Sequence, residues 1–255
     1  MLVSILCSGS EGNSVLVKTD KHKLLIDCGL NNKYIKDNLE EVGVNESDID
    51  SIFITHSHSD HIGALKVFLN KNHPRVYIDE KMFEDSAMDF LRDYDNLEFS
   101  KGPFELDDIS VEIYKTSHDA PGSRGYIISN NNKSVVYCTD TGYINHKLFD
   151  KLSNKTLYIF ESNHDIEMLM HGRYPSWLKK RVSSDTGHLS NHQAGFYLSK
   201  IIGEDTKQVV LAHISKENNT PEIALEDVLS ELKENDCKFS NLICAKQRER
   251  LDIEI

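Results

Sequence analysis

Short runs of apolar residues, many of them β-branched, recur along the whole chain, and turn residues follow most of them. Runs of this length and composition predict β-strands. We expect strands in the stretches LVSIL, SVLVKT, KLLID, SIFIT, RVYID, ISVEIYK, GYIIS, SVVYCTD, TLYIFES, QVVLAH and NLICA. Residues 124–138 are expected to form a β-hairpin.

Segments in which apolar residues have a helical spacing lie between these runs. They predict helices over residues 32–43, 62–70, 80–94, 175–182, 191–202 and 220–235. The last helix has a clear start, because Thr220 can cap it and Pro221 fits its first turn. Many strands with interspersed helices favour an α/β fold with mixed sheets over a doubly wound parallel sheet.

The composition adds limits on size and location. A chain of 255 residues can bury one full α/β core, and no repeat, low-complexity tract or linker divides it, so we expect a single domain over residues 1–255. No apolar run is long enough for a membrane helix, and the first residues lack the features of a signal peptide. The five cysteines are scattered, which is typical of a reducing cytosol. We therefore expect a cytoplasmic protein that does not bind membranes.

The net charge of −12 limits how the chain could bind nucleic acid. Proteins that bind nucleic acid by broad charge neutralisation are usually basic. Any contact with DNA or RNA is therefore expected to be local and assisted by metal ions.

Side chains that can carry chemistry follow many of the predicted strands. Their convergence at strand ends is how α/β enzymes build a site. These residues are Asp27, the cluster that begins at His56, His118, Asp140, Glu161 and His213.

The stretch THSHSDHIGAL carries four candidate metal ligands, His56, His58, Asp60 and His61. In extended chain, alternate residues point to one side, so His56 and His58 could share one metal ion. Asp60 and His61 follow the turn and could hold a second ion. The alternatives are a solvated surface tract and, for Asp60, a helix cap.

Two ions need further ligands, which the later strand ends can supply. His118 would complete the first site, His213 the second, and Asp140 could bridge them. Alternatively, these three are ordinary polar residues at strand ends. Imidazole and carboxylate ligands without thiolate suit Zn²⁺, Mn²⁺ or Fe²⁺.

The pattern H-x-H-x-D-H, followed by isolated His, Asp and His, resembles the metallo-β-lactamase superfamily over essentially the whole chain. The resemblance implies an α/β fold of the αββα sandwich type, with two mixed β-sheets flanked by helices and two divalent metal ions at one edge. It also implies that Asp27 supports a ligand rather than binding metal itself.

Within this superfamily, CSGSEGNS, SHDAPGSRGYII, TDTGY, ESNHDIEMLMHGRYP, TGHLSN and LAHISKENN closely resemble the YycJ/WalJ (VicX) group. That resemblance implies metal-dependent 5′-to-3′ exonuclease action on DNA, with a role in repair.

His188 in TGHLSN resembles a histidine of tRNA-maturing phosphodiesterases in the superfamily. An imidazole there can stabilise charge on the reacting phosphate or protonate the leaving oxygen. The resemblance also implies that Glu161 orients His188, and that His164 supports a ligand or binds metal. The alternative for His188 is a helix cap or a surface residue.

Two stretches are candidates for substrate contacts. The loop SGSEGNS could hold a phosphate with backbone N–H groups and Ser8, Ser10 or Asn13, or it could be a simple tight turn. GRYPSWLKKR combines aromatic residues with the cations Arg173, Lys179 and Lys180, which are candidate DNA contacts. A solvated helix face explains that stretch equally well.

We therefore predict a two-metal phosphodiesterase in which a metal-bridging hydroxide attacks, Asp60 orients it and His188 assists the leaving oxygen. The alternatives are a hydrolase of another ester class (lactonase, thioesterase or β-lactamase-like), RNA as the substrate, and a regulatory protein with a residual metal site. The segment between Asp140 and His213 is too short for an inserted nuclease domain. The prediction is action at DNA ends, nicks or gaps.

Overall fold

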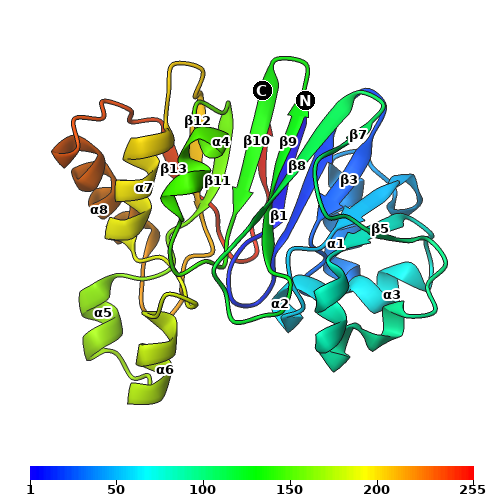
Figure 1. Ribbon diagram of the computed structural model, residues 1–255, viewed down its shortest axis with the longest axis horizontal. Helices are drawn as coiled ribbons and strands as arrows, with labels where there is room; N and C mark the ends of the chain where they lie inside the picture. Colours follow the sequence, from blue (N-terminus) through cyan, green and yellow to red (C-terminus); the bar gives the residue numbers. More distant parts are fainter.

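The computed structural model describes residues 1–255 and shows two β-sheets packed face to face, with helices on both outer surfaces (Figure 1). The first sheet has seven strands. In spatial order they are β14 (Leu251–Glu254), β1 (Leu2–Cys7), β2 (Ser14–Lys18), β3 (Lys23–Ile26), β4 (Ser51–Phe53), β5 (Arg75–Ile78) and β6 (Leu97–Phe99). Strands β14 to β3 of this order are antiparallel, and β3 to β6 are parallel.

The second sheet also has seven strands and repeats this mixed pattern. In spatial order they are β13 (Leu242–Cys244), β12 (Gln208–Ala212), β11 (Leu157–Glu161), β10 (Lys133–Cys138), β9 (Arg124–Asn130), β8 (Ile109–Lys115) and β7 (Phe104–Leu106). Strands β7 to β10 are antiparallel and β10 to β13 are parallel. The predicted αββα sandwich with two mixed sheets is therefore confirmed.

Alternation of side chains along each strand gives both sheets two apolar faces. In β2, Val15 and Val17 pack between the sheets, whereas Leu16 packs against the helices outside. In β11, Ile159 faces the other sheet and Phe160 faces outward. Because every central strand is covered on both sides, its residues form continuous apolar runs, as the sequence shows.

The helices cover the outer faces and also extend beyond the ends of the strands. The first sheet carries α1 (Asn32–Glu41), α2 (Ser59–Ile62) and α3 (Leu65–Leu69), and the second carries α4 (Phe149–Leu152), α7 (Asn191–Ile201) and α8 (Pro221–Glu234). Two more helices, α5 (Ile166–His171) and α6 (Ser176–Val182), project below the second sheet in Figure 1. None of the helices is both long and apolar enough to cross a membrane.

Every predicted strand is present, and the hairpin of residues 124–138 is confirmed as β9 and β10. Thr220 caps α8 as predicted, since its side chain accepts a hydrogen bond from the backbone N–H of Ile223. Strands β6, β7 and β14 were not predicted, because they are short and carry charged residues.

One predicted helix is wrong and another is divided. Residues 80–94 form two short 3-10 helices, Glu80–Glu84 and Ser86–Leu91, because Asp85 interrupts the segment and caps the second. Residues 62–70 are divided between α2 and α3. The short helices α4 and α5 were not predicted, because helices of one or two turns have too few residues to show a periodic pattern.

Candidate metal centre

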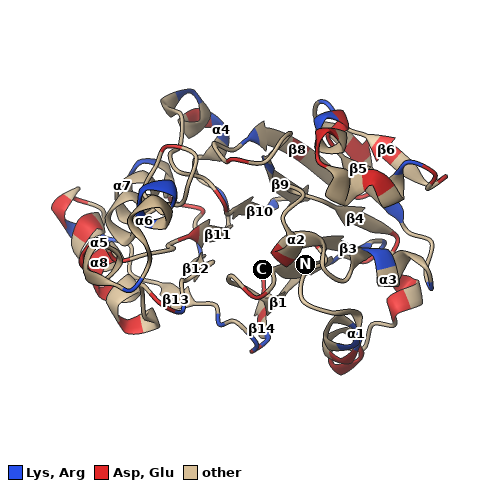
Figure 2. Ribbon diagram, turned by 90° about the horizontal axis from the view of Figure 1, so that it is seen from below, with Lys and Arg blue, Asp and Glu red and all other residues tan.

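The side chains predicted to carry chemistry come together at the edge where the parallel strands of both sheets end, the edge that Figure 2 views. Asp27 and the segment 56–61 follow β3 and β4 of the first sheet. His118, Asp140 and His213 follow β8, β10 and β12 of the second sheet. Packing of the two sheets therefore joins residues that are far apart in the sequence.

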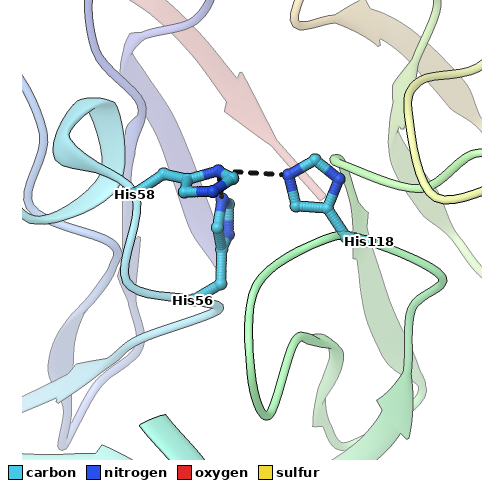
Figure 3. A group of neighbouring side chains, drawn as sticks. All are labelled: His56, His58 and His118. Carbon is cyan, nitrogen blue, oxygen red and sulfur yellow. Dashed lines mark hydrogen bonds between the residues drawn. The ribbon is translucent and has the colours of Figure 1, made fainter. Parts of the chain in front are cut away.

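His56, His58 and His118 form one cluster, which we call the tri-histidine group (Figure 3). Nδ1 of His58 lies 3.1 Å from Nε2 of His56 and 3.2 Å from Nε2 of His118. Figure 3 shows His118 reaching toward the other two rings from a separate loop. Three converging imidazole nitrogens are a donor set typical of a divalent transition metal.

Asp60, His61 and His213 form a second cluster, which we call the mixed group. Oδ2 of Asp60 lies 3.3 Å from Nε2 of His61 and 3.6 Å from Nε2 of His213. Asp60 is the second residue of α2, whose N-cap position belongs to His58. The alternative of Asp60 as a helix cap is therefore wrong, since its carboxylate faces the imidazoles instead.

Asp140 lies between the two groups. Its Oδ2 is 3.1 Å from Nε2 of His61, and its Oδ1 is 3.7 Å from Nε2 of His118. Oδ1 also lies 3.7 Å from Nδ1 of His213, so the carboxylate adjoins both groups, as expected of a bridging ligand.

Two atoms in this centre support its fit to metal ions. Oδ2 of Asp140 and Nε2 of His213 are buried and make no hydrogen bond. Buried polar atoms without a partner are rare because they are costly. Divalent cations would supply the missing partners, so the residues present fit a site for two ions. Their imidazole and carboxylate donors suit zinc, manganese or iron.

Carboxylates stand behind both imidazoles of the mixed group. Nδ1 of His61 lies 2.7 Å from Oδ2 of Asp27, which also accepts a 2.8 Å hydrogen bond from the hydroxyl of Thr55. Nδ1 of His213 lies 2.9 Å from Oε1 of Glu161. A carboxylate on one ring nitrogen fixes the tautomer and strengthens the other nitrogen as a metal donor.

Two rings of the tri-histidine group have uncharged partners behind them. Nδ1 of His56 lies 3.0 Å from the hydroxyl of Thr55, and Nδ1 of His118 lies 3.2 Å from the carbonyl oxygen of Gly187. The third ring, His58, is partly exposed, and its Nε2 lies 3.6 Å from Oδ1 of the partly exposed Asp119. This group therefore receives less electrostatic support than the mixed group.

The pKa shifts in the two groups run in opposite directions. Burial is the main cause that lowers the pKa of all three imidazoles in the tri-histidine group. Burial acts the same way on His61 and His213, but the surrounding carboxylates outweigh it. Asp140 and its neighbours raise the pKa of His213 to about 10, and the carboxylates around His61, Asp60 first, hold its pKa well above the ordinary value.

The backbone at three residues of the centre adopts the left-handed conformation. The φ angles of Asp27, Asp140 and His213 are 60°, 56° and 55°. In non-glycine residues this conformation costs on the order of 1–3 kcal/mol and is concentrated at functional sites. Asp27 and His213 come directly after a strand, and Asp140 comes two residues after one. The sequence gives no sign of the left-handed conformation.

Glu161 connects the mixed group to His188. Its Oε1 lies 2.8 Å from Nδ1 of His188, and its Oε2 accepts hydrogen bonds from the backbone of Thr141 and Leu189. Nδ1 of His188 is 3.7 Å from Oδ1 of Asp140. Helix α7 is capped by Ser190, so the helix-cap alternative for His188 is wrong.

His164 belongs to neither group. Its side chain is buried, its Nδ1 has no hydrogen-bond partner, and burial lowers its pKa to about 4. The structure gives it no contact with the candidate ligands.

The glycine-rich loop after β1 forms hydrogen bonds with residues of the mixed group. The side chain of Asn13 bonds the backbone of Gly9 and donates to Oδ2 of Asp60 over 3.1 Å. The hydroxyl of Ser8 accepts a 2.8 Å hydrogen bond from the backbone of His213. Of the three predicted phosphate contacts in this loop, Ser10 lines the cleft over the metal groups.

That cleft has a volume of about 300 Å³ and is walled on one side by the α5–α6 segment. The wall includes Tyr174 and Arg181, and Arg181 forms a bidentate ion pair with Asp119. Sequence reasoning missed this pair, although Asp119 directly follows His118 and Arg181 lies in the predicted basic stretch. Oδ1 of Asp119 is 3.5 Å from Nε2 of His118.

The other cations of this segment lie farther out. Arg173 and Lys180 are exposed and do not line the cleft. The amine of Lys179 donates to the carbonyl oxygen of Met170 at the end of α5.

Comparison with known proteins identifies a matching family and relatives of similar length. Residues 8–190 match the family model described as the metallo-beta-lactamase superfamily. Exodeoxyribonuclease YycJ of Bacillus anthracis is 39% identical over 91% of this chain and 89% of its own length. Exodeoxyribonuclease WalJ of Streptococcus pneumoniae is also 39% identical, over 91% of this chain and 88% of its own length.

A solved structure supports the fold. The metallo-beta-lactamase fold protein YhfI from Bacillus subtilis matches with a TM-score of 0.71 and 18% identity, covering 98% of both chains. At this level of identity the likeness concerns the fold.

Proposed function

The chain belongs to the metallo-β-lactamase superfamily and is a hydrolase of that fold, and from this premise we propose that it is a metal-dependent DNA exonuclease. The observation that carries the proposal is the pair His188 and Glu161 beside Asp140, because a hydrolase of phosphodiesters needs a proton donor next to its metal centre. The two relatives named exodeoxyribonuclease support DNA as the substrate.

In this proposal the tri-histidine group would hold one divalent ion, the mixed group would hold the other, and Asp140 would contribute to both. We propose zinc or manganese as the natural ions, and iron also suits the donors. Such ions, when bound, clamp the phosphate and lower the pKa of water toward neutrality. Asp60 orients the attacking water by accepting its hydrogen bond.

His188 then donates the proton that the leaving oxygen needs. Glu161 holds Nδ1 of the ring, so Nε2 remains to face the phosphate. Burial raises the pKa of Glu161, but His188 and His213 outweigh it and lower the pKa to about 2. The carboxylate is therefore ionised at neutral pH and holds the His188 ring in place through its 2.8 Å contact with Nδ1.

The α5–α6 segment provides the proposed contacts to the DNA strand. Trp177 is 69% exposed and lies between Arg173 and Lys180, also exposed. Exposed aromatic rings stack on bases, and cations beside them bind the phosphate backbone. These contacts, together with 5′-to-3′ polarity, action at ends or nicks during DNA repair, a cytoplasmic location and a single domain, are the finer parts of the proposal.

The test is digestion of 5′-phosphorylated, end-labelled duplex DNA with Mn²⁺ or Zn²⁺, with labelled RNA in parallel. We expect wild-type protein to shorten DNA and His188→Ala to slow this by about 100-fold or more, the range that general acids supply. His73→Ala, at an exposed histidine, is the matched control. Intact DNA with every metal, or full activity of His188→Ala, contradicts the proposal, and preferential cutting of RNA changes the substrate.

A further inference from the structure

A second and larger cavity, of about 600 Å³, adjoins the metal centre. It shares Ser215 with the cleft over the metal groups, and its wall includes Ser8, which bonds the backbone of His213. The segment from His213 to Lys216 runs from the mixed group directly into this cavity. A ligand that fills the cavity would therefore lie next to whatever is bound at the metal centre.

Positive side chains gather around the cavity. Lys216, Lys246 and Arg248 line it, although the whole chain has a net charge of −12. Figure 2 shows basic residues on the loop that joins β13 to β14. A local group of cations in an acidic protein marks a place where an anion can bind.

Lys246 donates a 2.7 Å hydrogen bond to Glu249, and the other two cations are paired with Glu11. The carboxylate of Glu11 accepts hydrogen bonds of 3.2 Å from Nζ of Lys216 and 2.6 Å from Nε of Arg248. These bonds, Lys216 first, lower the pKa of Glu11. A carboxylate held in this way has the same partners that a phosphate group would take.

The wall of the cavity is fixed by Gln247. Its side chain accepts a hydrogen bond from the backbone N–H of Glu11 and donates one to the carbonyl oxygen of Ile214. It also lies against Gly9, where an added Cβ would overlap it. Three distant segments are thus tied together, so the cavity is part of the fold.

We propose that this cavity binds the DNA strand next to the bond that is cut, with Lys216 and Arg248 on its phosphates. Glu11 acts as an internal competitor that the strand displaces. The inference rests on the proposed function and names the path of its substrate. The cavity volume of about 600 Å³ falls within the roughly 300–1,000 Å³ of ligand pockets.

The test is strand binding by the full-length, metal-loaded protein. The probe is a fluorescein-labelled single DNA strand with phosphorothioate linkages, followed by anisotropy at several salt concentrations. We expect the double variant Lys216→Gln with Arg248→Gln to weaken binding about tenfold and to reduce the salt dependence by about two counterions. Glu11→Gln should strengthen binding about threefold, because it frees both cations.

The ion pair of Lys36 and Glu40 on α1 supplies matched controls, Lys36→Gln and Glu40→Gln, which should bind like wild type. The inference is overturned if the double variant and Glu11→Gln both bind the strand with the affinity of the wild-type protein. So does a free deoxynucleoside monophosphate that displaces the strand as well as an unlabelled strand does, since the cavity would then be a mononucleotide site.

A small substrate separates this inference from the proposed function. Bis(p-nitrophenyl) phosphate needs the metal centre but no strand path, so wild-type protein should hydrolyse it. Hydrolysis of this diester, combined with unaltered strand binding by the variants, overturns the strand path alone. If wild-type protein hydrolyses neither this diester nor DNA, the proposed function is overturned. Altered strand binding by the variants would still support the cavity as the strand-binding site.

Discussion

The tri-histidine group and the mixed group flank the same carboxylate, Asp140, but their imidazoles have different partners. In the mixed group, buried Asp27 and Glu161 stand behind His61 and His213. In the tri-histidine group, a hydroxyl and a backbone carbonyl stand behind His56 and His118. The carboxylate near Nε2 of His58 is that of the partly exposed Asp119. Rings of the same chemistry would therefore differ in their affinity for a metal ion, because the residues behind them set their charge and basicity.

The difference predicts unequal binding of the two ions. Carboxylates behind an imidazole typically raise metal affinity, and their loss costs roughly 10–100-fold. The mixed group should therefore hold its ion more tightly at high pH, where its ligands have lost their protons. The tri-histidine group should depend less on pH, because burial keeps its rings neutral.

The largest expected effect comes from Asp140→Ala, because this substitution removes a carboxylate that both groups share. We expect the variant to lose affinity for both ions by more than the roughly 100-fold that an outer partner costs. Metal content after dialysis, measured by mass spectrometry, checks this. A variant that retains both ions would show that Asp140 is not a shared ligand.

A smaller effect is expected from Asp27→Asn, which should separate the two groups. The amide keeps the size of the side chain but removes the charge behind His61, so the mixed group should bind its ion roughly 10–100-fold more weakly. The tri-histidine group should change little. Chelator competition resolves the two affinities, and circular dichroism checks the fold. Equal weakening of both groups would contradict the comparison.

The smallest expected effect is a difference in proton release. The pKa of His213 is raised to about 10, so in metal-free protein this ring is protonated at neutral pH and an ion must displace the proton. Binding at the mixed group should therefore weaken as the pH falls. The lowered pKa values of the tri-histidine rings predict little proton release there. Calorimetric titration in two buffers of different ionisation heat measures how many protons each group releases when it binds metal. Equal proton release at the two groups would contradict the predicted difference between them.

The sequence predicted which side chains come together at this edge because most of the signals are local. The spacing of His56 and His58 places both rings on one side of an extended chain, and polar residues that follow apolar strands mark the site edge. Contacts between distant segments were not predictable in this way. The ion pair of Asp119 and Arg181, the second cavity and the left-handed backbone of Asp140 all depend on how the two sheets pack.

The fold shows the same division. Long, buried strands were predicted because alternation and apolar runs are visible over several residues. Strand β14 was missed because it depends on pairing with β1, and the helix predicted over residues 80–94 was wrong because Asp85 divides it.

The pairing of β14 with β1 also determines when the first sheet can be completed during synthesis. A ribosome makes β1 first and β14 last of all the strands, so the edge of β1 has no partner until Leu251–Glu254 has emerged. The mixed group likewise needs His213, which is made long after His56 and His58. The candidate ligands of the segment His56–His61 therefore emerge long before their partners, and the two groups can be complete only after β12 has been made.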